Sequence, residues 1–167
     1  MNILRPLHWP AVLILAVAAA VTNVRAEDDC IDISQIDSAL KAKVDVLEEG
    51  TGRCSGEFKF KTIPKKLQGL PCVSIKRGAK EEAGASYTFV LKKPATVYLF
   101  VMENGTPAIP DGWERTPFQA LWGFDPESSL LDTVYSRHFE AGEVVVPAHD
   151  GKASNFGVPH LCVVACE

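Results

Sequence analysis

The chain has 167 residues, of which 47% are hydrophobic and 23% are charged, and its formal net charge is −4. This composition excludes a collagen, a coiled coil and a disordered chain, and it is typical of one ordinary globular domain. The acidic balance argues against nucleic acid or an anionic membrane surface as the main partner, because both require clustered Lys and Arg.

The first 26 residues have the pattern of a secretory signal peptide. Residues 11–21 form an unbroken apolar run behind a weakly basic start, and Val24-Arg25-Ala26 precedes three acidic residues. This run is too short to cross a membrane as a helix, and no later stretch is long enough. We therefore predict cleavage after Ala26, a single mature domain over residues 27–167 without a membrane span, and a secreted or periplasmic location.

Between Gly and Pro residues, apolar side chains alternate with polar ones in short segments, and helical periodicity is nearly absent. The pattern predicts an all-β domain, an antiparallel two-sheet β-sandwich of about eight strands. One short N-terminal helix is expected at residues 33–40, capped by Ser34 or Asp37. The strands are expected at residues 44–48, 57–62, 72–76, 86–91, 96–102, 133–139, 143–147 and 161–166.

Two of these segments carry further predictions. Residues 96–102 are apolar on both faces, which indicates a central strand. The sequence Glu140-Ala141-Gly142 indicates a hairpin turn between the segments 133–139 and 143–147, with Gly142 supplying a positive φ angle.

All five cysteines follow the predicted signal, so they enter an oxidising compartment in which nearby thiols form disulfides. An odd number leaves at least one thiol free. Cys162 and Cys166 lie on one face of a predicted strand, about 13 Å apart, which is too far for a bond. Among the other arrangements we favour Cys30 with Cys166 and Cys54 with Cys72, which leaves Cys162 buried and free.

A zinc site and a catalytic thiol are alternative interpretations of the same cysteines. No Cys-x-x-Cys pair occurs, and His149 and His160 lack a regular ligand spacing. We therefore expect no metal site, no other cofactor and no nucleophilic cysteine.

Residues 103–126 contain too much proline for a central strand or a long helix, which predicts one long Pro/Trp-rich loop. Trp113, Trp122 and Phe118 are the candidate ligand-binding residues, since aromatic rings stack on the apolar faces of sugars and long loops often carry recognition. An alternative is that these rings fill one end of the core.

Six short segments carry a resemblance to a known family, residues 58–60, 63–69, 73–75, 93–99, 110–113 and 134–144. Together they resemble a small β-sandwich module of secreted bacterial proteins, which occurs alone or appended to polysaccharide-degrading enzymes. The resemblance implies a non-catalytic accessory or binding module, and it carries over no catalytic residues.

These observations favour a secreted, non-enzymatic protein that binds an extracellular or envelope polysaccharide. A structural or adhesive protein that contacts another envelope protein, with a spare cysteine joining two copies, is the alternative hypothesis. The third is a small hydrolase that uses the carboxylates of Asp111, Glu114 and Asp125 as acid and base.

Overall fold

A computed structural model describes residues 30–103, 109, 111–125, 127–150 and 157–167, so the predicted signal peptide lies outside the described residues. Among the described residues, no helix has the length and apolar character needed to cross a membrane. The elements in chain order are β1 (Ile31–Asp32), the 3₁₀ turn η1 (Ser38–Leu40), β2 (Lys43–Val46), β3 (Gly52–Cys54), β4 (Glu57–Thr62), the 3₁₀ turn η2 (Lys65–Leu67), β5 (Pro71–Ser74), β6 (Tyr87–Leu91), β7 (Ala95–Met102), β8 (Glu114–Gly123), β9 (Leu130–Phe139), β10 (Gly142–Val146) and β11 (Leu161–Cys166).

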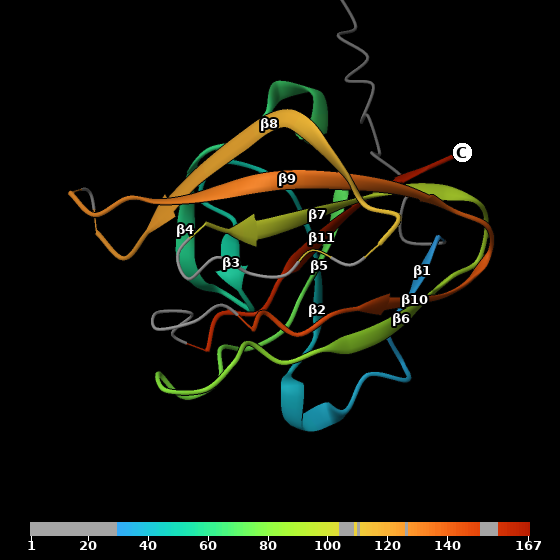
Figure 1. Ribbon diagram of the computed structural model, residues 1–167, viewed down its shortest axis with the longest axis horizontal. Helices are drawn as coiled ribbons and strands as arrows, with labels where there is room; N and C mark the ends of the chain where they lie inside the picture. Colours follow the sequence, from blue (N-terminus) through green and yellow to red (C-terminus); the bar gives the residue numbers. More distant parts are fainter. Residues whose placement is uncertain (1–29, 104–108, 110, 126, 151–156) are drawn as a thin grey trace, which may run out of the picture.

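The strands form two antiparallel sheets, which confirms the predicted all-β, two-sheet fold (Figure 1). The smaller sheet has the order β1-β6-β10, and the larger has the order β2-β5-β11-β7-β9-β8-β4-β3. Each of the expected strands corresponds to an observed one, and the bounds of β4 and β11 match the prediction.

Strand β7 is central in the larger sheet, between β11 and β9, as its two apolar faces predicted. Val97 and Leu99 point to one face and join a core with Phe89 of the smaller sheet. Phe100 points to the opposite face and joins a second core. The larger sheet therefore separates two cores, and β7 contributes side chains to both.

The second core exists because the larger sheet curls until its outer strands cover its own face. Phe60 of β4 reaches Phe100 of β7, with 5.8 Å between the ring centroids. Beyond β3, the amide of Ser55 donates a hydrogen bond of 3.2 Å to the hydroxyl of Ser74 at the end of β5. This curl excludes water from the inner face.

The predicted hairpin at residues 140–142 is wrong. Strand β9 pairs with β7 and β8, whereas β10 pairs with β6 in the other sheet. The chain therefore turns a corner between the two sheets at this point. Gly142 does have a positive φ, 142°; a positive φ permits a sharp bend but does not decide which strands pair.

The predicted long loop is also corrected, since strand β8 occupies residues 114–123 of it. Pro117 is tolerated because the register with β9 shifts between Arg115 and Gln119, so proline interrupts no regular pairing there. The hydroxyl of Thr116 replaces part of the ladder: it donates to the carbonyl of Val134 at 2.7 Å and accepts from the amide of Phe118 at 3.1 Å.

The predicted helix at 33–40 is reduced to one 3₁₀ turn over Ser38–Leu40. Asp37 caps it, as expected, by accepting a hydrogen bond from the amide of Ala39 at 2.8 Å. The turn ends at Lys41, whose left-handed φ of 48° stops the helix.

The disulfide between Cys30 and Cys166 is present, with 6.4 Å between the Cα atoms, and it joins the two ends of the described domain. The predicted bond between Cys54 and Cys72 is wrong, because both are free and buried. The strands that contain these two cysteines are not neighbours: β3, with Cys54, pairs with β4, and β5, with Cys72, pairs with β2 and β11. Cys162 is buried and free, as expected.

Candidate functional site

A largely apolar pocket of about 530 Å³ opens where β4, the end of β8 and the segment after β5 meet. We call it the aromatic pocket. Its volume is in the range of small-molecule sites. Its lining consists of Phe58, Arg77, Lys80, Trp122, Phe124, Ser128, Ser129, Leu130 and Val158.

Phe124 is 65% exposed at this pocket and is held there by the turn that follows β8. The Asp125 carboxylate accepts hydrogen bonds from the amides of Glu127 and Ser128 at 2.9 and 2.7 Å. A Cβ at Gly123 would lie 2.3 Å from the Ser128 carbonyl oxygen, so the close approach of this turn requires glycine. The exposed ring is therefore presented by a well-bonded turn.

Phe58 forms the neighbouring wall of the pocket and has a left-handed φ of 51°. Its ring packs edge-on to that of Phe124, with centroids 4.3 Å apart, and the Trp122 ring lies 5.5 Å away. The Arg77 guanidinium carbon lies 5.4 Å from the Phe58 centroid, within the range of a cation–π contact. A positive φ is costly for a bulky residue, and such strain is frequent at ligand sites.

The three aromatic residues predicted to bind a ligand do not form one exposed row. Trp122 is fully buried in the second core, because β8 is a strand whose alternation turns this ring inward. Trp113 packs against the first core, 5.7 Å from Phe139. Phe118 is half-buried and lies 6.3 Å from Tyr98. Of the three, only Trp122 lines the aromatic pocket.

Sequence reasoning missed the aromatic residues that the structure places together at the pocket. The sequence predicts Phe58 in a strand and Phe124 in the long loop, and it names neither as a ligand-binding residue. The alternation of Phe58 and Phe60 with lysine residues predicts the strand correctly. The positive φ at Phe58 and the tertiary contact with Phe124 have no local signal.

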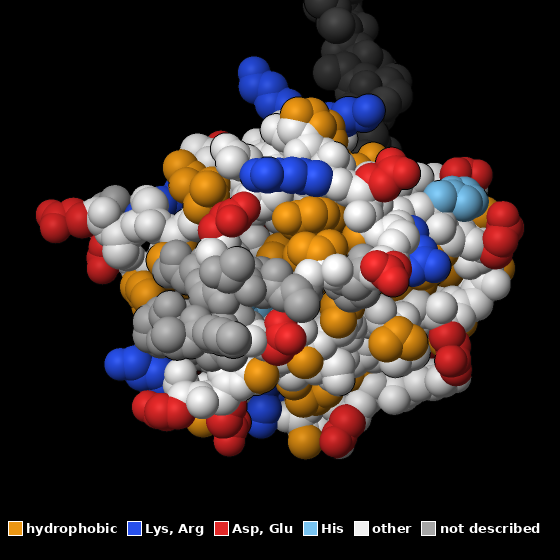
Figure 2. Space-filling model, viewed as in Figure 1, with side chains coloured by type: hydrophobic (Ala, Val, Ile, Leu, Met, Phe, Trp, Pro, Cys, Tyr) orange, Lys and Arg blue, Asp and Glu red, His pale blue; other side chains and the backbone are white. Residues whose placement is uncertain are grey.

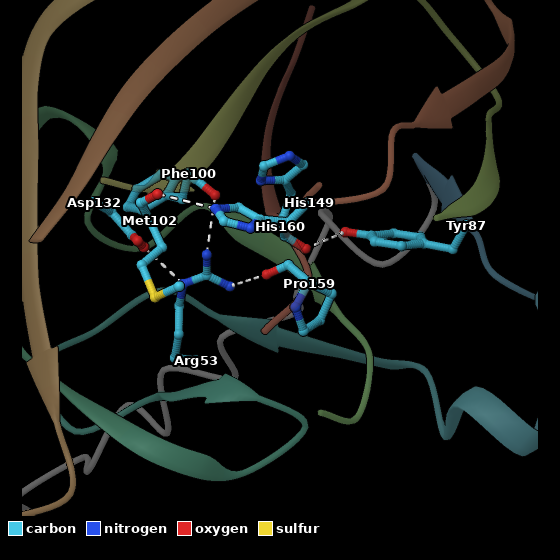
Figure 3. Close-up of polar contacts among 8 residues, drawn as sticks. All are labelled: Arg53, Tyr87, Phe100, Met102, Asp132, His149, Pro159 and His160. Atoms are coloured by element: carbon cyan, nitrogen blue, oxygen red, sulfur yellow. Dashed lines mark hydrogen bonds and ion pairs between the residues drawn. The ribbon is translucent and has the colours of Figure 1, made fainter. Parts of the chain in front are cut away.

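A second group of chemically active side chains lies inside the larger sheet (Figure 3). The Arg53 Nε donates to the Asp132 carboxylate at 2.6 Å, and its terminal nitrogens donate to the carbonyls of Pro159 and Phe100 at 2.8 and 3.0 Å. The rings of His149 and His160 lie beside it, 5.0 Å apart.

Burial explains the titration behaviour of this polar cluster. It lowers the pKa of His149 and lowers that of His160 well below its ordinary value, with nearby His149 and Arg53 adding to the second effect. Perturbed pKa values are typical of active sites, but they also occur in sealed ion-pair networks. Arg53, Asp132, His149 and His160 all have 0% exposure, so no substrate reaches them in this conformation.

Among the described residues, no group of three His, Cys, Asp or Glu side chains could hold a metal ion. The three carboxylates considered as acid and base lie at the two ends of β8. Glu114 begins β8 and Asp125 follows its other end, about 30 Å away along an extended strand. Hydrogen bonds from Ser128 and Glu127 lower the pKa of Asp125, and a lowered pKa is unfavourable for a general acid. Asp111 precedes β8 in the sequence, on the side of the strand away from Asp125.

No model of a known protein family matches the sequence, and neither does any curated protein. Among solved structures, a beta-glucuronidase from glycoside hydrolase family 2 is similar to 74% of this chain, with a TM-score of 0.59 and 15% identity. A GH138 enzyme targeting pectin rhamnogalacturonan II is similar to 80% of it, with a TM-score of 0.46 and 13% identity. This chain spans 13% and 15% of the two enzymes. The first likeness shows a shared β fold; the second is too weak to carry an argument.

Proposed function

We propose that this protein is a secreted, non-catalytic module that binds a polysaccharide through the aromatic pocket. The observation that carries the proposal is the Phe124 ring, 65% exposed and packed at 4.3 Å on Phe58 at the mouth of a pocket. Apolar ring faces are suited to stack on sugar rings. The hydroxyls of Ser128 and Ser129 and the cations of Arg77 and Lys80 supply polar groups at its edge.

The composition of the pocket supports binding without chemistry. Among the described residues that line it, none is Asp or Glu, the carboxylates that most glycoside hydrolases use as acid, base or nucleophile. The similarity to part of a glycoside hydrolase agrees with a role as an accessory module, since this chain spans 13% of that enzyme. The disulfide supports a location outside the cytoplasm.

A protein partner is the second candidate, because the apolar lining would also accept an apolar side chain. Covalent pairing of two copies through a spare cysteine is not supported. Cys54, Cys72 and Cys162 are each at most 1% exposed and cannot reach a second chain without unfolding.

A glycan array that includes plant, algal and bacterial polysaccharides tests the proposal directly. We expect the mature protein to bind at least one polysaccharide class and to release no reducing ends from it during prolonged incubation. Failure to bind any glycan would refute the binding role, and release of reducing ends would refute the non-catalytic role.

A further inference from the structure

A second pocket adjoins the aromatic one and is basic. It has a volume of about 420 Å³, and its charged lining residues are Lys41, Lys43, Lys76, Arg77 and Glu57. Arg77 lines both pockets, so the two pockets share this side chain. Its guanidinium carbon lies 5.4 Å from the centroid of the Phe58 ring.

The backbone brings three separate segments together at this basic pocket. The Ser55 hydroxyl donates to the carbonyl of Lys41 at 2.8 Å, which joins the turn after β3 to the end of η1. The amide of Lys76 donates to the carbonyl of Leu40 at 2.8 Å, which adds the segment after β5. Different parts of the chain therefore contribute the lysines that line this pocket.

Backbone strain is concentrated at the two pockets. Among the described residues, the non-glycine residues with positive φ are Lys41 at 48°, Ser55 at 42° and Phe58 at 51°. Lys41 and Ser55 line the basic pocket, and Phe58 lines the aromatic pocket. Strained residues of this kind cluster at ligand sites, where the surrounding structure holds them in place.

The charge of the basic pocket contrasts with that of the whole molecule. The chain has a net charge of −4, and acidic and basic side chains are interspersed on the face shown in Figure 2. Four cationic side chains line the basic pocket against Glu57, although Lys43 is also paired with Asp45 at 2.7 Å. A lining with more cationic than anionic side chains attracts an anionic group of a ligand.

We propose that the two pockets form one site for an acidic polysaccharide. A sugar ring packs against Phe58 and Phe124, and a carboxylate or sulfate group on the chain binds among Lys41, Lys76 and Arg77. This inference rests on the proposed polysaccharide-binding function and names the class of ligand. It is supported by the shared Arg77, the lysines that line the basic pocket and the strain at both pockets.

Affinity electrophoresis and calorimetric titration with matched polymers test the inference. Polygalacturonate is compared with its methyl ester, and dextran sulfate with dextran, so that the two arms separate carboxylate from sulfate recognition. The test variant is Lys41→Gln with Lys76→Gln, which leaves Arg77 and the Lys43–Asp45 pair intact. The control is Lys65→Gln with Lys66→Gln, which removes the same charge from exposed residues of η2.

We expect binding to one acidic polymer, none to its neutral counterpart, and a loss of about tenfold or more in the Lys41/Lys76 variant alone, because charge-assisted contacts are lost there. Equal weakening in both variants would indicate non-specific attraction and overturn the inference. Binding to a neutral polymer that neither variant weakens would overturn the inference and leave the proposed function intact. Binding to no polysaccharide, acidic or neutral, would overturn both.

Discussion

The Arg53 guanidinium and the Asp132 carboxylate form an ion pair 2.6 Å long, with both side chains fully buried. Arg53 belongs to β3, at the edge of the larger sheet, and Asp132 belongs to β9 near its centre. The two backbone carbonyls that also accept from Arg53 belong to β7 and to the segment before β11. This pair therefore fastens the curled edge of the sheet over its inner face.

Loss of Asp132 should destabilise the fold strongly. Asp132→Ala leaves the Arg53 charge buried without its partner, and breaking such a pair costs about 3–5 kcal/mol. We expect a lower midpoint of urea unfolding. Asp45→Ala, which breaks the more exposed Lys43–Asp45 pair, is the control and should cost less than about 1 kcal/mol. Equal effects of the two changes would contradict this role of Asp132.

The buried histidines predict a loss of stability in mild acid. In the folded chain their pKa values lie below the ordinary value of 6.5, so the unfolded chain binds more protons as the pH falls through 6.5. The free energy of unfolding should therefore decrease between pH 7 and pH 5. Arg53, Asp132 and the Met102 carbonyl face the pair, and Arg53 further disfavours its protonation.

Urea unfolding at a series of pH values measures this effect. We expect His160→Phe to reduce the dependence on pH, since it removes one group that must stay neutral in the fold. His138→Gln is the control, because His138 is 48% exposed. A pH dependence that persists unchanged in His160→Phe would contradict the assignment.

The free cysteines should not react with thiol reagents in the folded protein. Burial raises the pKa of Cys54 to about 11 and those of Cys72 and Cys162 to about 12, so little thiolate exists at pH 8. We expect Ellman's reagent to detect no rapid reaction in the native state and three thiols per mature chain in guanidinium chloride. A single thiol in the denatured protein would mean that two of these three cysteines are bonded, which would contradict the structure.

The bond between Cys30 and Cys166 should be the main covalent contribution to stability. It closes a loop with a sequence separation of 136, which restricts the unfolded chain. Removal through Cys30→Ala with Cys166→Ala should lower the free energy of unfolding by about 2–4 kcal/mol. Dithiothreitol should lower the stability of the wild type toward that of the double variant and leave the double variant unchanged. Equal stability of the oxidised wild type and the variant would contradict this role.

Local alternation predicted much of the fold. It located β4 and β11 with their bounds and placed β7 at the centre of a sheet. A strand that is buried on one face has apolar residues at alternate positions, and one that is buried on both faces is apolar throughout. It failed at Pro117, which occupies a register shift, and at Gly142, where a corner between sheets has the same turn residues as a hairpin.

The site was less predictable because it depends on contacts between distant segments. Trp113 and Trp122 are candidates because aromatic rings stack on sugars, yet they pack against different cores. Phe58, Arg77 and Phe124 are far apart in the sequence, and only the curl of the larger sheet brings them to one pocket. No short motif records that arrangement.

Calorimetric titration of the polysaccharide that the array identifies is the most direct test of the binding site. Phe124→Ser removes the exposed ring, and Val145→Ser, at a similarly exposed position on the smaller sheet, is the matched control. We predict a loss of affinity of about tenfold or more for Phe124→Ser, because burial of such a ring contributes about 1.5–3 kcal/mol, and no loss for Val145→Ser. Wild-type affinity in Phe124→Ser would show that the polysaccharide binds elsewhere.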